Sequence, residues 1–328
     1  MDELLLAWTS MNLIFQDLGN WLIAPMRALS YLGQQEFVML LLPAIYWCWD
    51  STLGFRLGAI LMLSNGVNAI LKLAFHSPRP YWINTEVKAL SVETSFGLPS
   101  GHAQNAAALW GRLAIAMRKK WVKWIFVIII GLIGLSRVYL GMHFLSDVAA
   151  GWLIGGLLVW LVVRLEGPIS GWLGKKSVAI QVLWAALAAG VVILLGLMTR
   201  LALGSWQVPD LWKANALLQN PNDPITPLSL EGLFTVAGTW WGMAAGYAWF
   251  TRKYGHFNAK GAWEKRGLRF SLGLVVLILL WYGLGLIFPR TEDILSYCLR
   301  FFRYALMGGW VSAGGPWLFL RLKLADHA

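Results

Sequence analysis

Residues 121–164 read WVKWIFVIIIGLIGLSRVYLGMHFLSDVAAGWLIGGLLVWLVVR, two long apolar runs joined by a short polar turn. An α-helix needs about 20 mostly apolar residues to cross the hydrocarbon core of a bilayer. The runs 121–141 and 146–164 are close to that length, and the turn at 142–146 separates them. This stretch therefore predicts two consecutive transmembrane helices.

The same pattern continues along the chain, which is 58% hydrophobic and only 13% charged. Soluble domains carry about 25% charged residues, so this is the composition of a membrane protein. The 21 tryptophans suit aromatic belts at the two membrane interfaces. We predict an all-α fold, a polytopic integral membrane helix bundle of about nine spans, near 36–50, 53–75, 101–118, 121–141, 146–164, 178–200, 231–250, 268–288 and 303–320.

Composition divides the chain into four regions. Residues 1–35 are apolar but interrupted by polar residues, glycine and proline, which favours an N-terminal interfacial segment of one or two helices. A further membrane span is the alternative for this segment. Residues 36–200 form the predicted core bundle, and 201–230, rich in proline, asparagine and aspartate, an irregular extracytoplasmic loop. Residues 231–328 form a C-terminal transmembrane extension of about three spans.

The formal net charge of +11 raises the question of a nucleic-acid partner. The basic residues lie in short loops between apolar spans, and every alternate loop contributes to the same side, as the positive-inside rule describes. We therefore expect no nucleic-acid partner and assign these loops to the cytoplasm. The opposite, extracytoplasmic side carries the loops that hold the polar motifs, 76–100 and 142–146 among them.

Three cations stand at the ends of these spans: Lys72, Arg79 and Arg137. Each alone is explained by a lysine that extends to the interface or by an arginine at the end of a helix. Together they suit a phosphoryl group, because arginine binds phosphate oxygens bidentately and lysine acts as a point charge. A phosphoryl group in transfer spreads its negative charge over three oxygens.

The tetrapeptide Pro99-Ser100-Gly101-His102 precedes an apolar helix. Ser100 is a suitable N-cap, and an anion is favoured at the N–H groups of a helix start. Gly101 lets the backbone approach that anion closely, and His102 lies in the first turn. A lone histidine there is more often a surface or capping residue, so the tetrapeptide as a whole carries the interpretation.

His143 and Asp147 stand four residues apart at the start of the next span, where a helix would place them on one face. A carboxylate bound to one ring nitrogen fixes the tautomer and leaves the other nitrogen free to attack. A simple capping pair is the alternative. Zn²⁺ could also bind His102, His143 and Asp147, but the nearby cations would repel it. We therefore expect no metal and no cofactor.

The patterns K-x6-R-P, P-S-G-H and S-R-x5-H-x3-D together resemble the signature of the type-2 phosphatidic acid phosphatase superfamily. That superfamily includes lipid phosphate phosphatases, undecaprenyl pyrophosphate phosphatases, sphingosine-1-phosphate phosphatases, glucose-6-phosphatase and vanadium haloperoxidases. The resemblance covers about residues 50–165. The extra spans after residue 200 and the string Arg79-Pro80-Tyr81-Trp82 are more similar to the glucose-6-phosphatase and sphingosine-1-phosphate phosphatase branches.

The resemblance implies a role for each motif residue. His143 would be the nucleophile that forms a phosphohistidine, with Asp147 orienting it. His102 would protonate the leaving alkoxide and then act as the base that activates water. The remaining residues would hold the phosphoryl oxygens: Lys72, Arg79, Ser100, Gly101 and Arg137.

These observations predict a membrane phosphatase for a lipid-linked phosphate or pyrophosphate, such as undecaprenyl pyrophosphate, phosphatidate or a sphingoid-base phosphate. We expect it in a bacterial inner membrane, with membrane lipids around it and its site facing the periplasm or exterior. A phosphotransferase, a sugar-phosphate phosphatase, and a non-enzymatic transporter or scaffold for polyprenyl lipids are alternatives. The glycines at 238, 242 and 246 suit close helix packing within the monomer, a homodimer face or a lipid-tail groove.

Overall fold

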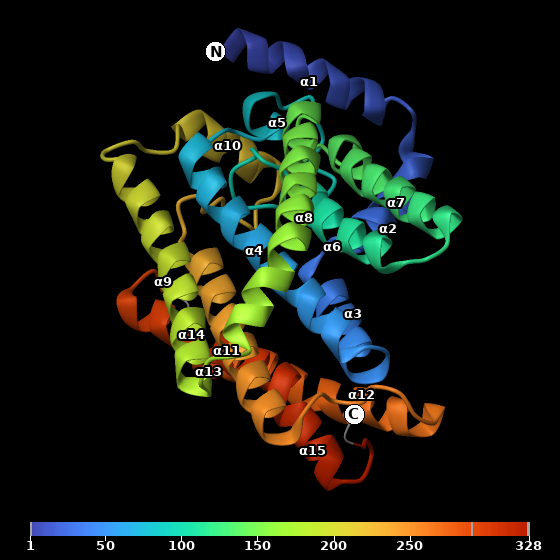
Figure 1. The fold of residues 1–328 in the computed structure, drawn as a ribbon. Coiled ribbons are helices and arrows are strands. Elements are labelled where there is room, and N and C mark those ends of the chain that lie inside the picture. Colours follow the sequence, from blue (N-terminus) through green and yellow to red (C-terminus); the bar gives the residue numbers. More distant parts are fainter. Residues whose placement is uncertain (1, 290, 327–328) are drawn as a thin grey trace. The chain divides into compact units, whose positions relative to one another are not determined.

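The structure is a computed structural model that describes residues 2–289 and 291–326 (Figure 1). Residues 1, 290, 327 and 328, which belong to the predicted N-terminal segment and C-terminal extension, lie outside the described residues. The first half of the chain contains α1 (Asp2–Gln16), η1 (Asn20–Leu22), α2 (Ile23–Tyr31), α3 (Gln35–Cys48), α4 (Ser51–Phe75), α5 (Pro80–Ile83), α6 (Gly101–Ala116), α7 (Lys120–Tyr139) and α8 (Leu145–Leu173).

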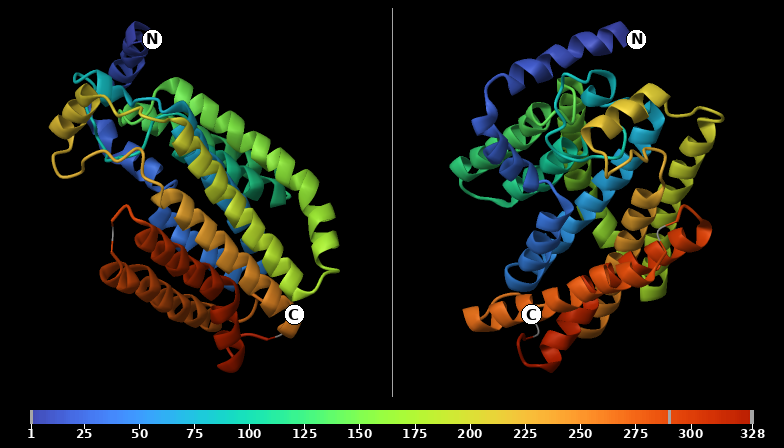
Figure 2. Two further views of the ribbon diagram at one scale, coloured as in Figure 1. Left: turned by 90° about the vertical axis from the view of Figure 1, so that its left-hand side faces the viewer. Right: turned by 180° about the vertical axis from the view of Figure 1, so that it is seen from behind.

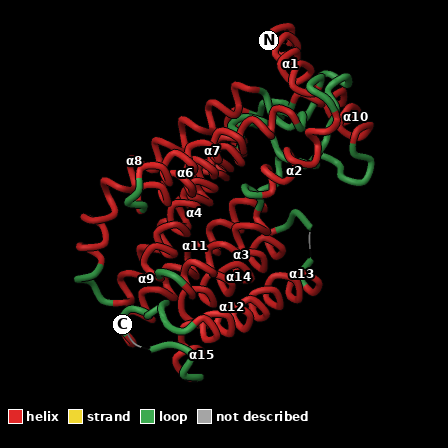
Figure 3. The backbone as a smooth tube through the Cα atoms, turned by 90° about the vertical axis from the view of Figure 1, so that its right-hand side faces the viewer, coloured by secondary structure: helices red, strands yellow, loops and turns green. Residues whose placement is uncertain are grey.

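The second half contains α9 (Val178–Ala202), α10 (Asp210–Gln219), α11 (Glu231–Tyr254), α12 (Trp263–Ile278), η2 (Leu279–Gly283), α13 (Leu284–Ile287), α14 (Ile294–Gly309), η3 (Trp310–Gly314) and α15 (Gly315–Arg321). The described residues contain helices and no strand, which confirms the all-α class. Figure 3 shows this helical content, with the loops of the chain in green.

Each predicted span coincides with a helix or with consecutive helical segments. The helices that are both long and apolar enough to cross a membrane lie at Ser51–Ile83, Lys120–Tyr139, Leu145–Leu173, Val178–Ala202 and Trp263–Ile287. The described chain therefore has 5 candidate spans by length and composition, and α3 is a shorter apolar helix. The total of about nine crossings stays a prediction.

The chain forms two compact units, and each combines segments that are distant in sequence. Unit 1 contains residues 1–37, 67–161 and 196–229, and unit 2 contains residues 38–66, 162–195 and 230–328. The motifs all lie in unit 1. Unit 1 also contains a feature that the sequence analysis did not predict, the ten-residue helix α10 within the loop 201–230. Pro209 directly precedes this helix and Asp210 lies in its first turn, and both residue types favour a helix start.

In unit 2, helices α11 and α14 pack side by side (Figure 2). A Cβ added at Gly238 would meet the backbone of Phe301, and one at Gly242 would meet the backbone of Ala305. The small residues therefore let two backbones approach within the chain, as one of the predicted alternatives required. The glycine face of α11, which could otherwise have formed a dimer interface or a groove for a lipid tail, is thus used within the chain. A homodimer stays a prediction.

Within the last predicted span, 303–320, the regular helix is interrupted by a single π-helical turn, η3. A π-turn changes the hydrogen-bond register and leaves carbonyl groups without their usual helical partners. The Tyr46 hydroxyl donates to the Ser312 carbonyl at 3.1 Å, and the Trp47 indole donates to the Val311 carbonyl at 2.9 Å. Two aromatic side chains of α3 thus stabilise the interruption.

In unit 1, the carboxyl ends of α4 and α7 meet the amino ends of α6 and α8. The N–H of Ser100, before α6, donates to the Asp147 carbonyl in the first turn of α8 at 3.0 Å. The loop between α5 and α6 is tied down by backbone bonds from Leu90 to Leu140 and from Thr226 to Thr94. These contacts bring the ends of four helices and one anchored loop to a single place.

Candidate active site

Two cations of the site, Lys72 and Arg79, bind the same stretch of the loop between α5 and α6. Lys72 ends α4, and its Nζ donates to the Ser95 hydroxyl and the Phe96 carbonyl, both at 2.8 Å. Arg79 is fully buried, and its Nε donates to the Ser95 carbonyl at 2.6 Å. These bonds hold both cations against Ser95 and Phe96.

Arg79 also reaches His143. Its Nη1 lies 3.2 Å from Nε2 of His143 and donates to the Met142 carbonyl at 2.8 Å. On its other side, Nδ1 of His143 lies 3.3 Å from Oδ2 of Asp147. A guanidinium can only donate, so this network assigns the proton to Nδ1 and the lone pair to Nε2. His143 therefore presents Nε2 to the cation and Nδ1–H to the carboxylate.

The prediction that His143 and Asp147 share one helical face is wrong in one respect. His143 lies in the turn before α8, which begins at Leu145, and only Asp147 is in the helix. Oδ2 of Asp147 reaches back and also accepts from the Phe144 N–H at 3.1 Å. Asp147 thus does both things that were offered as alternatives, because it caps the helix start and binds the imidazole.

The environment of His143 keeps its ring neutral. Its side chain is almost fully buried, and Arg79, Lys72 and Arg137 lie nearby. Burial is the largest effect and the neighbouring cations add to it, and together they lower the pKa of His143 well below its usual value. A neutral imidazole has the free lone pair that a nucleophile requires.

The start of α6 has the geometry predicted for the tetrapeptide. Ser100 is the N-cap, and its hydroxyl accepts from the Ala103 N–H at 3.5 Å. Asn68 of α4, which the sequence analysis did not single out, packs against Gly101. Its amide donates to the Pro99 carbonyl at 3.2 Å and to the Gln104 side chain at 3.0 Å. Asn68 therefore holds the turn that would carry the anion.

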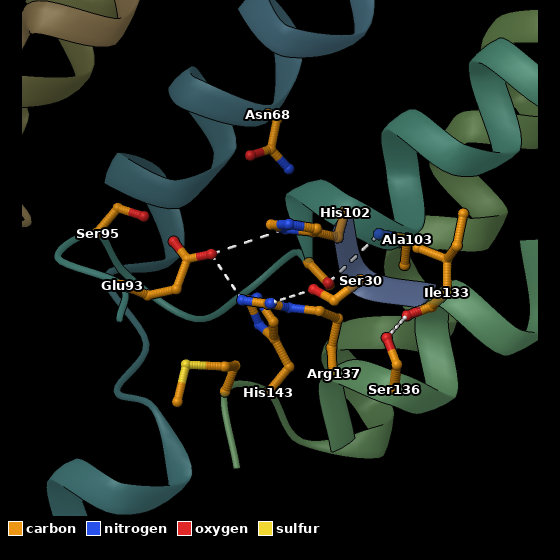
Figure 4. Close-up of polar contacts among 12 residues, drawn as sticks. Ser30, Asn68, Glu93, Ser95, His102, Ala103, Ile133, Ser136, Arg137 and His143 are labelled. Carbon is orange, nitrogen blue, oxygen red and sulfur yellow. Dashed lines mark hydrogen bonds and ion pairs between the residues drawn. The ribbon is translucent and has the colours of Figure 1, made fainter. Parts of the chain in front are cut away.

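A carboxylate that the sequence analysis missed lies among the cations (Figure 4). Glu93 accepts from Nη2 of Arg137 at 2.6 Å and lies 3.5 Å from Nη2 of Arg79. Its Oε1 is 3.7 Å from Nδ1 of His102. The only signal in the sequence was that Glu86 and Glu93 are the two carboxylates between the first two motifs, which does not tell them apart.

Glu93 is ionised under ordinary conditions. Burial raises the pKa of its carboxyl, but Arg79 and Arg137, together with His102 and Lys72, outweigh that effect and lower the pKa to about 2. The cluster therefore holds a negative charge beside the basic side chains of Lys72, Arg79 and Arg137.

The structure brings every predicted site residue into one region of unit 1: Lys72, Arg79, Ser100, Gly101, His102, Arg137, His143 and Asp147. Within the described residues, no group of three or more His, Cys, Asp or Glu is placed to hold a metal ion. The arrangement places a neutral imidazole bonded to a carboxylate, a second imidazole and three basic side chains together, which are the groups that the predicted phosphoryl chemistry requires.

Two family models match the chain. One, described as PAP2 superfamily, covers residues 53–171. The other, described as PAP2 superfamily phosphatase, transmembrane extension, covers residues 234–327. The first contains every predicted site residue, and the second corresponds to the predicted C-terminal extension.

Individual relatives agree with these matches. Phosphatidylglycerophosphatase B of Bacillus subtilis is 34% identical over 169 residues, which are 45% of this chain and 77% of the relative. Glucose-6-phosphatase catalytic subunit 1 of Haplochromis nubilus is 31% identical over 169 residues, 43% of this chain and 48% of the relative. The crystal structure of a PAP2-type phosphatidylglycerolphosphate phosphatase from Bacillus subtilis aligns with a TM-score of 0.43 at 28% identity, covering 50% of this chain and 86% of that one.

Proposed function

Since this chain belongs to the PAP2 superfamily of membrane phosphatases, we propose that it hydrolyses a lipid-linked phosphate or pyrophosphate through a phosphohistidine, without a metal, at the extracytoplasmic face of a bacterial inner membrane. The observation that carries the proposal is the orientation of His143. Its Nδ1 faces Asp147 at 3.3 Å and its Nε2 faces Arg79 at 3.2 Å. The nitrogen with the lone pair therefore points toward a cation that would bind the phosphoryl oxygens.

In the first step, Nε2 of His143 attacks phosphorus and the bond from phosphorus to the leaving oxygen breaks. The developing positive charge on the imidazole is stabilised by Asp147, which accepts from Nδ1–H. Lys72, Arg79 and Arg137, with the N–H groups at the start of α6, would balance the charge on the phosphoryl oxygens. This step forms the phosphohistidine and an alkoxide or phosphate leaving group.

His102, when its ring carries the second proton, would supply the proton that the leaving oxygen needs. Its Nε2 is buried and makes no hydrogen bond among the described residues, whereas Nδ1 faces Glu93. In the second step, water attacks the phosphohistidine, His102 takes the proton from that water, and inorganic phosphate leaves. Each proton given up in one step is recovered in the other.

A lipid substrate is supported by where the site lies along the helices. Lys72 and Arg137 are in the last turns of α4 and α7, and Asp147 is in the first turn of α8. All three helices belong to segments apolar enough to cross a membrane. A phosphate headgroup could reach these helix ends while its apolar tail stays in the bilayer.

The test uses detergent-purified protein and a panel of phosphatidate, phosphatidylglycerophosphate, undecaprenyl pyrophosphate, a sphingoid-base phosphate and glucose 6-phosphate. We expect inorganic phosphate from at least one lipid, activity that persists in EDTA, inhibition by orthovanadate, and no turnover by His143→Ala. Full turnover by that variant would exclude His143 as the nucleophile.

The same assay separates the alternatives. A radiolabelled phosphate that appears in a second lipid rather than in free phosphate would identify a phosphotransferase. Turnover of glucose 6-phosphate alone would identify a sugar-phosphate phosphatase. Release from none of the substrates by the wild-type protein would favour a non-enzymatic transporter or scaffold.

A further inference from the structure

The N-terminal segment, residues 2–33, contacts three of the proposed catalytic groups. It lies outside both matched family segments, which begin at residues 53 and 234. The sequence analysis predicted an interfacial segment and assigned it no site residue. In unit 1, however, this segment contacts Arg137, His143 and His102. None of its residues belongs to the three motifs.

Ser30, in the last turn of α2, is bonded to Arg137 (Figure 4). Both side chains are buried, and Nη1 of Arg137 donates to the Ser30 hydroxyl at 2.6 Å. Nη2 of the same guanidinium donates to Glu93 at 2.6 Å. Two hydrogen-bond acceptors therefore fix the plane of the buried guanidinium. Ser30 is the uncharged acceptor, so it does not compete with a phosphate for the positive charge of Arg137.

Asn12, in α1, is bonded to the backbone that carries His143. It is fully buried, and its Nδ2 donates to the Val138 carbonyl at 2.8 Å and to the His143 carbonyl at 3.0 Å. One amide thus ties the end of α7 to the turn before α8. Gln16, one turn further along α1, makes the same kind of bond to the Tyr139 and Lys88 carbonyls, and neither partner is a proposed catalytic residue.

Gly33 completes the contact between this segment and the site. A Cβ added there would lie 3.0 Å from Cδ2 of His102, tighter than ordinary van der Waals contact. The backbone of residue 33 therefore lies against the ring of the proposed general acid, on the chain segment that follows Ser30.

We propose that the N-terminal segment is an integral arm of the active site, in which Ser30 and Asn12 are positioning residues that aim the Arg137 guanidinium and fix the His143 backbone. The proposal rests on the proposed phosphatase function. Since a displacement of about 1 Å at a reacting group can cost about 10²-fold in rate, such residues act without touching the substrate.

The first test compares Ser30→Ala with Ser10→Ala. Ser10 is an exposed residue of the same segment whose hydroxyl bonds only within its own helix turn. We expect Ser30→Ala to lower kcat/KM and weaken orthovanadate inhibition, each by about tenfold, as for one lost hydrogen bond to a charged group. Ser10→Ala should match the wild-type protein in kinetics and in unfolding temperature, and Ser30→Ala should stay folded at the assay temperature but unfold at a lower temperature than the wild-type protein. Unchanged kinetics and vanadate affinity in Ser30→Ala would overturn the role of Ser30.

The second test compares Asn12→Asp with Gln16→Glu. Each change keeps the size of the side chain, removes the donor and sets a carboxylate oxygen against two carbonyls. We expect Asn12→Asp to lower kcat by about 10²-fold with little change in KM, and Gln16→Glu to keep most of the wild-type kcat. Equal losses in the two variants would show that α1 has only detached, which would overturn the role of Asn12.

Wild-type protein and His143→Ala are measured in the same series. A wild-type protein that releases no phosphate would overturn the proposed function and this inference together. An active wild-type protein whose Ser30→Ala and Asn12→Asp variants both behave normally would overturn this inference alone.

Discussion

The Glu93 carboxylate lies 2.6 Å from Nη2 of Arg137, so a guanidinium expected to bind phosphoryl oxygens already holds an anion. The same carboxylate faces Arg79 and His102. Its own backbone is anchored, because the Tyr81 hydroxyl donates to the Glu93 carbonyl at 3.0 Å. Glu93 is therefore a structural member of the cluster. A phosphate that enters the site must share Arg79 and Arg137 with this carboxylate.

Neutralising Glu93 should change vanadate affinity and kcat in opposite directions. In Glu93→Gln the competing charge is gone, so we expect orthovanadate to bind about fivefold more tightly, as for an ion-pair contribution of about 1 kcal/mol. We also expect kcat to fall by about tenfold, because the charged anchor of Arg137 is replaced by a weaker, neutral amide oxygen. Steady-state kinetics and vanadate inhibition measure both effects.

The control for Glu93→Gln is Glu86→Gln, an exposed carboxylate of the same loop. It should leave both quantities at their wild-type values. Weaker vanadate binding in Glu93→Gln would contradict the interpretation of Glu93 as a competing anion.

Glu93 should also make stability depend on pH. Its pKa is lowered from 4.5 to about 2, because the cations outweigh the effect of burial. A lowered folded-state pKa contributes stability that is present above the unfolded pKa and is lost as the pH falls toward the folded pKa. We expect the wild-type protein to unfold at a higher temperature than Glu93→Gln at pH 7, and the difference to shrink between about pH 4.5 and 2. A difference that grew on acidification would have the wrong sign.

Replacing Asp147 should remove most activity and leave the fold intact. Oδ2 of Asp147 accepts from both His143 Nδ1 and the Phe144 N–H. An amide at this position no longer provides the charge that stabilises the imidazolium or reliably selects its tautomer. We expect kcat of Asp147→Asn to fall by about 10²- to 10⁴-fold, the range for a carboxylate that orients a catalytic histidine.

Asp210→Asn is the matched control for that variant, because Asp210 is exposed and pairs only with Lys213. Tryptophan fluorescence should show wild-type folding in both proteins. If Asp147→Asn kept more than half of the wild-type kcat, Asp147 would be a capping residue alone.

Gly242 should matter for stability rather than chemistry. A Cβ there would overlap the Ala305 backbone of α14, whereas one at Gly232 of the same helix would meet nothing within 4 Å. We expect Gly242→Ala to lower the free energy of unfolding by about 1–3 kcal/mol, as for overpacking. Gly232→Ala should be neutral or slightly stabilising. Thermal unfolding in detergent compares them, and equal midpoints would show that α11 and α14 separate without cost.

The sequence determined the helical class, the places of the apolar segments and the residues of the three motifs. Apolar length and local motif spacing are properties of contiguous residues, so they can be read without coordinates. The pairing of His143 with Asp147 was predicted because four residues cannot move far apart. Even there, the sequence placed His143 on the helix, whereas the structure places it in the preceding turn.

Only the tertiary structure decided which distant side chains complete the site. Glu93 and Arg137 are 44 residues apart, and Asn12 and His143 are 131 apart, so no local spacing connects them. Ser30 resembled any serine in an apolar helix until α2 and α7 were seen to pack together. A buried guanidinium must find partners wherever the fold supplies them, and the order of residues along the chain does not specify which ones those are.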